Sequence, residues 1–236
     1  MKLKTIILQG DSKYEKENQL FPIRWKSHHV TELFMELFPD IELDGNRQLT
    51  ILATRDRREN AKKYNNYKAF NASAYYLEEA QIKTLETLNP EDAESFILGI
   101  IEEVLVDITN IIGEDEQKRT VIKDTIKQVR EMEFSLKKKM KTLSKKSKVG
   151  KYKADVFRCL NKVSGEVWCV EIENGISGQT RVEWLTSKPN YLDRRDYFKK
   201  SKWEENKFII TNRLGVEVFS IEVGGYGRII MNKVIY

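Results

Sequence analysis

Histidine and cysteine are scarce in this chain of 236 residues, which contains two of each. His28 and His29 are adjacent, and neighbours in a helix point about 100° apart, so this pair cannot face one metal ion. We expect both in a solvent-facing first helical turn after Ser27. Cys159 and Cys169 form no Cys-x-x-Cys motif, and two cysteines make no disulfide framework, so free thiols are the default. The scarcity removes the commonest metal-ligand and thiol-catalysis patterns.

Proline, glycine and long apolar runs are also limited. With 4 Pro and 12 Gly against 40% hydrophobic residues, the composition excludes collagen-like and low-complexity classes and disfavours disorder. The most apolar stretch, 96–112, contains three acids, whereas a membrane span requires about 20 mostly apolar residues. The apolar run at 5–8 is too short for a secretory signal. We therefore expect a cytoplasmic globular protein with no membrane partner.

Charge is distributed very unevenly, although the net charge is only +5. The segment 91–116 contains nine acids and no base, and the segment 137–153 contains nine lysines and no acid. Without these lysines the rest of the chain is net negative. The positive charge is therefore local to one segment, which we call the lysine block (137–153).

The period of the hydrophobic pattern changes near residue 148. Before it, a spacing of three and four predicts helices at 28–38, 60–88, 93–112 and 115–143, with strands at 3–9 and 48–54. After it, alternation predicts strands at 152–160, 166–173, 180–186, 207–212, 215–223 and 226–235. The fold class is therefore expected to be α+β. A helix-rich part, 1–148, has a β-α-β start and three further helices, and an antiparallel meander-like sheet of about six strands follows at 149–236. Whether the two parts share one core stays open.

The first hairpin of that sheet allows a register to be derived. If Val163-Ser164-Gly165 is a three-residue loop, Cys159 faces Cys169 across the strands, and Lys162 faces Glu166. Even-numbered residues then form an apolar face, and we expect the side chains of Trp168 and Trp184 in the core of the sheet. The two thiols share the opposite face, where they pack as small hydrophobic groups or form a redox switch.

Acids also gather on this odd-numbered face, beside Lys153. Asp155, Glu171 and Glu173 offer oxygen ligands for a magnesium ion. Over about 20 residues this pattern resembles the restriction-endonuclease-like nucleases, which have an acid on one strand and an acid, any residue and a lysine on the next. In this sequence Glu173 stands where that family has the lysine. The alternative interpretation is a solvated strand face with acids spaced by the pleat.

The lysine block allows two interpretations. Its lysines could neutralise phosphates and bind nucleic acid without sequence preference. Only Tyr152 could offer a stacking surface, and the block has no interleaved pattern of arginines and aromatic residues of the kind that reads bases. It could instead be compensated internally, at a helix carboxyl terminus and beside the acidic helix. The lysines that would matter most are Lys137, Lys138, Lys139, Lys145 and Lys146.

No phosphate loop, dinucleotide fingerprint or nucleophile–base pair is found, and no cofactor is expected. Gly224-Gly225-Tyr226-Gly227 lies between two strand patterns and is expected to form a hairpin turn. We therefore expect a non-enzymatic protein that acts through a protein–protein interface. In size and general character it resembles bacterial immunity proteins, the inhibitors of toxins delivered between cells. Expected contacts are Arg194, Arg195, Trp203 and the lysine block.

Overall fold

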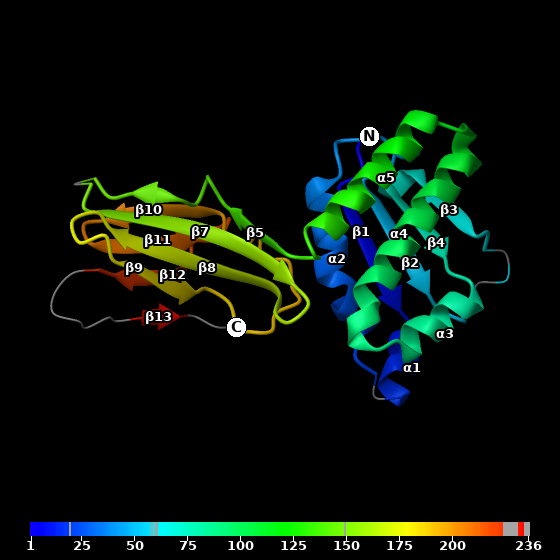
Figure 1. Cartoon of the computed structure of the whole chain (residues 1–236), viewed down its shortest axis with the longest axis horizontal. Helices are drawn as coiled ribbons and strands as arrows, with labels where there is room; N and C mark the ends of the chain where they lie inside the picture. The colour runs from blue at the N-terminus through cyan, green and yellow to red at the C-terminus, as the bar shows by residue number, and fades with distance from the viewer. Residues whose placement is uncertain (19, 58, 60, 149, 224–230, 234–236) are drawn as a thin grey trace. The chain divides into compact units, whose positions relative to one another are not determined.

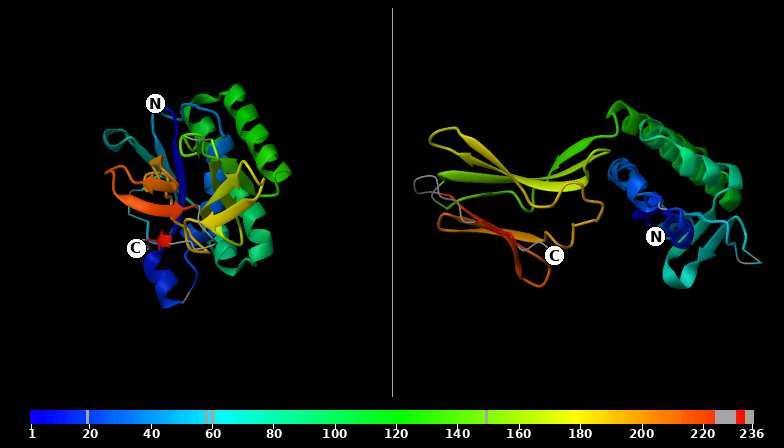
Figure 2. Two further views of the ribbon diagram at one scale, coloured as in Figure 1. Left: turned by 90° about the vertical axis from the view of Figure 1, so that its left-hand side faces the viewer. Right: turned by 90° about the horizontal axis from the view of Figure 1, so that it is seen from below.

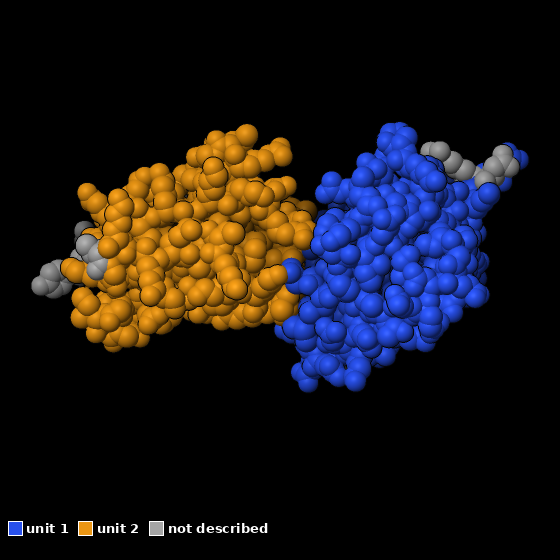
Figure 3. All heavy atoms as spheres, turned by 90° about the horizontal axis from the view of Figure 1, so that it is seen from above, with its two compact units in different colours: residues 1–135 blue, residues 136–236 orange. Residues whose placement is uncertain are grey.

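The computed structural model describes residues 1–18, 20–57, 59, 61–148, 150–223 and 231–233. The fold class is α+β, as expected. Two compact units divide the chain, Met1–Ser135 and Leu136–Tyr236 (Figures 1 and 3). The sequence pattern placed this boundary near residue 148, and the difference arises where the lysine block begins.

Unit 1 contains a parallel sheet with one antiparallel edge strand. Its elements are β1 (Thr5–Gly10), α1 (Ser12–Glu17), α2 (Ile23–Leu37), β2 (Gln48–Ala53), β3 (Tyr64–Tyr67), a 3-10 turn η1 (Lys68–Phe70), β4 (Ala72–Tyr76), α3 (Glu79–Thr87), α4 (Pro90–Gly113) and α5 (Glu116–Glu131). The strand order is β1-β2-β4-β3, with β1, β2 and β4 parallel.

Alternation along these strands buries one face of the sheet. Ile6 and Leu8 on β1 and Leu49 and Ile51 on β2 are buried, whereas the residues between them are partly exposed. Helix α2 packs against β1 and also contacts α4 and α5. Figure 1 shows α4 and α5 lying together over the sheet. The core of unit 1 therefore lies between one face of the sheet and a layer of helices.

The prediction of one helix over 60–88 is wrong. Residues 64–76 form β3, the turn η1 and β4, and only α3 is helical. Asn71, between the two strands, has a left-handed backbone with φ of 51°, which tightens the turn that pairs them. Tyr64 and Tyr75 are β-favouring residues and are directly opposite each other. Of the residues whose helical spacing predicted a helix, Tyr67 lies in β3 and Ala74 in β4.

The helix expected at 115–143 ends twelve residues early. Helix α5 stops at Glu131, and Glu133 and Phe134 adopt positive φ angles of 48° and 54°, which no helix continues through. The lysines at 137–139 and 145–146 are in extended strands. The start of the lysine block therefore belongs to a sheet of unit 2. It does not lie at the carboxyl terminus of a helix, where its charge was expected to be compensated.

Unit 2 is built from two antiparallel sheets and is no single meander. Its strands are β5 (Leu136–Lys139), β6 (Lys145–Lys146), β7 (Tyr152–Asn161), β8 (Gly165–Asn174), β9 (Thr180–Trp184), β10 (Lys200–Glu204), β11 (Lys207–Thr211), β12 (Glu217–Glu222) and β13 (Met231–Lys233). One sheet has the order β5-β7-β8-β9, with β6 also paired to β7, and the other has the order β10-β11-β12-β13.

The two sheets of unit 2 face each other across one core, and Figure 2 shows them as two layers. The core contains Val156, Trp168 and Val170 from the first sheet and Phe208 and Phe219 from the second. Trp168 is fully buried, as expected, and its ring contacts Phe198 in the segment that crosses between the sheets. The prediction of a single sheet failed because this crossing segment, 185–199, has no periodic pattern.

Two further expectations concern the ends of the described region. The strand expected at 226–235 is represented by β13, and the rest of it lies outside the described residues, as does the turn expected at 224–227.

None of the helices in the described ranges combines the length and the apolarity that crossing a bilayer requires.

Candidate functional site

The hairpin between β7 and β8 has a different register from the predicted one. Asn161 pairs with Gly165, so the loop is 162–164 and lies one residue earlier than expected. The side chain of Asn161 accepts hydrogen bonds from the backbone N–H groups of Val163 and Ser164 and organises this turn. Gly165, with φ of 66°, closes the loop in the left-handed conformation that favours glycine. Consequently Cys159 faces Val167 and not Cys169, and Glu166 faces Leu160 and not Lys162.

The predicted faces survive this shift because it preserves even and odd numbering. The outer face of the five-stranded sheet is the set of side chains that point away from the sandwich core. It comprises Lys137 and Lys139 on β5, Lys153, Asp155, Phe157 and Cys159 on β7, Cys169, Glu171 and Glu173 on β8, and Thr180, Val182 and Trp184 on β9.

Lysines and acids on the outer face form one network. Asp155 binds Lys139 at 2.7 Å and Lys153 at 2.9 Å. Lys137 binds Glu171 at 2.5 Å, and Lys153 also reaches Glu173 at 3.4 Å. Burial disfavours the charged form of Asp155, but the hydrogen bonds from Lys139 and Lys153 outweigh it and hold its pKa below the ordinary value. The network neutralises all three acids that were candidate magnesium ligands.

The three acids do not converge on a common point. Asp155 and Glu171 are directly opposite each other, and Glu173 is opposite Lys153. Within the described residues, no group of three or more histidine, cysteine, aspartate or glutamate side chains is placed to hold a metal ion. Position 173 has glutamate where the nuclease motif has lysine, and Lys137, Lys139 and Lys153 all bind acids of this face.

The network predicts an acid-dependent component of stability. Because the pKa of Asp155 is lowered on folding, its stabilisation is full above the unfolded value of about 3.9 and is lost as the pH falls through the folded-state value. In urea denaturation, Asp155→Asn should therefore destabilise the protein at about pH 7 and destabilise it less at about pH 3, below the unfolded pKa. The exposed Asp196→Asn is the control and should change little at either pH. An equal effect of Asp155→Asn at both values would contradict the ion-pair assignment.

The lysine block is compensated only in part, and from a different source than expected. Strand acids, rather than the acidic helix, bind Lys137, Lys139 and Lys153. Another group of its lysines is exposed and makes no ion pair with an acid in the described part of the chain: Lys141, Lys145, Lys146, Lys148 and Lys151.

Trp184 is not in the core, contrary to expectation. It is on the edge strand β9, and 37% of its surface is exposed because it pairs with Cys169, so that the even-numbered residues of β9 share the outer face with the odd-numbered residues of β8. The ammonium group of Lys188 lies 2.9 Å from the centre of its ring, a cation–π contact. Val182, two residues earlier on the same face, is also exposed. The outer face therefore has an apolar, aromatic end beside its charged network.

A buried ion pair that the sequence analysis missed lies on the inner face. Arg158 and Glu166 are 1% and 0% exposed, and Nη2 of Arg158 donates to Oε2 of Glu166 at 2.6 Å. The indole Nε1 of Trp168 donates to the other carboxylate oxygen at 2.8 Å. Both charged residues have even numbers, so the alternation already pointed them inward. Two opposite charges on an otherwise apolar face were the available signal.

The expected partner contacts are anchored locally. The backbone N–H of Arg194 donates to Glu166, and its guanidinium lies over the ring of Tyr197 at 5.0 Å. Arg195 makes paired hydrogen bonds to Asp193. Trp203 is partly buried against the sandwich core, and its Nε1 donates to the carbonyl of Lys145 at 3.1 Å. These side chains belong to different parts of unit 2 and form no single cluster.

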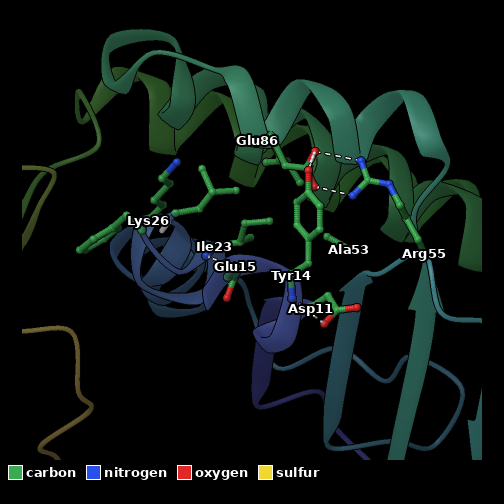
Figure 4. Close-up of a pocket in the computed structure, with 11 residues that line it drawn as sticks. Asp11, Tyr14, Glu15, Ile23, Lys26, Ala53, Arg55 and Glu86 are labelled. Atoms are coloured by element: carbon green, nitrogen blue, oxygen red, sulfur yellow. Dashed lines mark hydrogen bonds and ion pairs between the residues drawn. The ribbon is translucent and has the colours of Figure 1, made fainter. Parts of the chain in front are cut away.

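Unit 1 has a small cavity beyond the carboxyl ends of β1 and β2 (Figure 4). On one side Arg55 binds Glu86 through two hydrogen bonds, of 2.7 and 2.9 Å, and lies over the ring of Tyr14. The cavity holds about 60 Å³, enough for a few water molecules. A substrate site usually measures about 300–1,000 Å³, so this gap is too small for a molecule of ordinary size.

The histidines are placed differently from the expectation. Helix α2 begins at Ile23, one turn before Ser27, so His28 and His29 lie in its second turn. His29 is buried, and its Nε2 lies 2.7 Å from Oε1 of Glu94 on α4. This contact joins two helices of the unit 1 core. A partner 65 residues away leaves no local signal in the sequence.

No protein-family model matches the chain, and no curated protein or solved structure matches it.

Proposed function

We propose that this chain is a non-enzymatic, cytoplasmic binding protein that acts through a protein–protein interface. The observation that carries the proposal is the outer face of the five-stranded sheet, where exposed Trp184 and Val182 lie beside a network of lysines and acids. Binding energy in protein interfaces concentrates in aromatic anchors surrounded by polar groups. A surface with both charges in fixed positions favours a partner of complementary charge pattern.

Within this class we propose an immunity-type inhibitor that neutralises a cognate bacterial toxin. Such a protein binds its target tightly and needs no turnover. The candidate acids of the outer face support this, since lysines bind all three of them. Lys137 and Lys139 lie on the same face. The other expected contacts, Arg194, Arg195 and Trp203, lie elsewhere in unit 2 and would extend the interface there.

The test begins with the tagged full chain, recovered from its native lysate after nuclease digestion. A partner retained at stoichiometric yield is then purified, and its affinity and its own activity are measured with the chain present. Trp184→Ala is expected to weaken binding about 10-fold or more, as loss of an aromatic anchor does. Leu214→Ala, a 78% exposed residue in the loop before β12, is the matched control. Equal affinity of both variants would contradict the proposed interface.

A second candidate function is electrostatic binding of nucleic acid. The exposed lysines between 141 and 151 that make no ion pair in the described part of the chain favour it. It predicts that affinity for any duplex falls steeply as salt rises, and that Lys145→Gln with Lys146→Gln reduces the salt slope by about 2. Binding unchanged between low and moderate salt, or no binding at low salt, would remove this candidate.

A further inference from the structure

The two cysteines lie side by side in the middle of the outer face. Cys159 on β7 is partly exposed and is directly opposite Lys137 on β5. Cys169 on β8 is buried and is directly opposite Trp184 on β9. Across β7 and β8 the cysteines are diagonal neighbours, because Cys159 faces Val167 and Cys169 faces Phe157. They are the only cysteines in the chain.

Hydrogen bonding and charge around this pair distinguish its two sulfurs. The hydrogen bond from Cys169 is the largest influence on Cys159 and lowers its pKa; burial opposes it, and Lys137 and Lys188 add to it. Glu171 acts in the opposite direction, but its carboxylate binds Lys137 at 2.5 Å. The same hydrogen bond, together with burial, raises the pKa of Cys169. Cys159 is therefore the more acidic of the two thiols, and Cys169 is its hydrogen-bonding neighbour.

We propose that Cys159 and Cys169 form a dithiol site that hydroperoxides such as hydrogen peroxide oxidise to an intramolecular disulfide. The Cys159 thiolate attacks one peroxide oxygen, the O–O bond breaks, and hydroxide leaves and takes up a proton to become water. The Cys159 sulfenic acid that forms is then attacked by the sulfur of Cys169, which loses its proton as a second water leaves. Two thiols and one peroxide thus give one disulfide and two waters.

The diagonal placement makes this disulfide a reversible one. Cα atoms of diagonal cross-strand neighbours lie about 7–8 Å apart, beyond the usual disulfide range of about 4.4–6.8 Å. The strands must therefore shift to close the bond, and strained disulfides are reduced more readily than structural ones. Because Trp184 is directly opposite Cys169, that shift also moves the aromatic end of the outer face.

The test is a hydrogen peroxide titration of the purified full chain, followed by intact mass and maleimide labelling. We expect the mass to fall by about 2 Da, both thiols to become unreactive, and dithiothreitol to restore them. In Cys169→Ser, dimedone should instead trap a sulfenic acid on Cys159, and Cys159→Ser should not react. Wild-type protein that retains both thiols at peroxide excess, or that gains oxygen without losing 2 Da, would overturn the proposal.

A second variant keeps the test informative if a cysteine variant misfolds. Lys137→Met removes a positive charge opposite Cys159, so oxidation at about pH 7 should slow about threefold or more. The rate–pH profile of this variant should shift to higher pH, because loss of Lys137 raises the pKa of Cys159. The charged or titratable groups that still act on that sulfur are Lys188, Glu171 and Cys169. Lys202→Met, on the other sheet, is the control and should oxidise like the wild type. Identical pH profiles for all three proteins would also overturn the proposal.

Discussion

Replacing Glu166 with alanine is expected to lower the free energy of unfolding by about 3–5 kcal/mol, because the change leaves the buried charge of Arg158 without its carboxylate. The indole N–H of Trp168 loses its acceptor in the same step. The crossing segment also loses one contact, since the backbone N–H of Arg194 donates to the carboxylate of Glu166. Removing one member of a buried pair costs more than the pair contributes, because an unpaired charge stays out of water.

The measurement is urea denaturation followed by tryptophan fluorescence, with two comparison proteins. In Arg158→Leu combined with Glu166→Leu no buried charge is left, so this double variant should recover much of the lost stability. Glu204→Ala removes an exposed acid bound to Lys202 and should change stability by less than about 1 kcal/mol. A Glu166→Ala protein as stable as Glu204→Ala would contradict the assignment of a buried, structurally required ion pair.

The second large effect is expected at Gly10, at the carboxyl end of β1. A Cβ atom there would lie 2.1 Å from Oε1 of Glu15, which is buried and accepts the backbone N–H of Ile23 at 2.7 Å. That bond caps the amino terminus of α2, where Pro22 supplies no side-chain acceptor. Gly10→Ala must therefore displace the carboxylate or distort the strand, and we expect a loss of about 1–3 kcal/mol.

A double-mutant cycle isolates this cause. In the Glu15→Ala background the clashing carboxylate is absent, so Gly10→Ala should cost less than about 0.5 kcal/mol there. Gly99→Ala, inside α4 with no atom within 4 Å of the added carbon, is the control and should stabilise by up to about 1 kcal/mol. If Gly10→Ala costs the same in both backgrounds, the close approach to Glu15 is not the reason glycine is needed.

The parts of the fold that could be predicted are those with a long, uniform period. The apolar stripe of α4 and the alternation of β7 and β8 specify their own faces, and the structure keeps both. The segment 60–88 could not be predicted, because tyrosines and small residues at helical spacing pair as β3 and β4. The lysines at 137–139 continued a helical stripe, and only pairing with β7 makes them a strand.

The candidate site, too, could be predicted only where it depends on the period of the sequence pattern. Alternation placed Asp155, Glu171 and Glu173 on one face together with both cysteines, and the structure keeps that grouping. It did not reveal that Lys137 and Lys139 neutralise these acids, because those lysines come from a strand that was expected to be helical. The Arg158–Glu166 pair and the contact of His29 with Glu94 depend on tertiary proximity, which no spacing in the sequence encodes.

The position of β5 and β6 has a consequence for how molecules of this protein meet one another. Together these strands occupy the side of β7 away from β8, so within the described residues they form one border of the sheet. Backbone groups along such a border can template strands from a second chain, and closely spaced lysines oppose this by mutual repulsion. All five lysines named from the sequence lie on these two strands: Lys137, Lys138, Lys139, Lys145 and Lys146. We therefore expect the lysine block to oppose growth of this border into an intermolecular β-sheet, so that neutralising the charges of its lysines should favour aggregation.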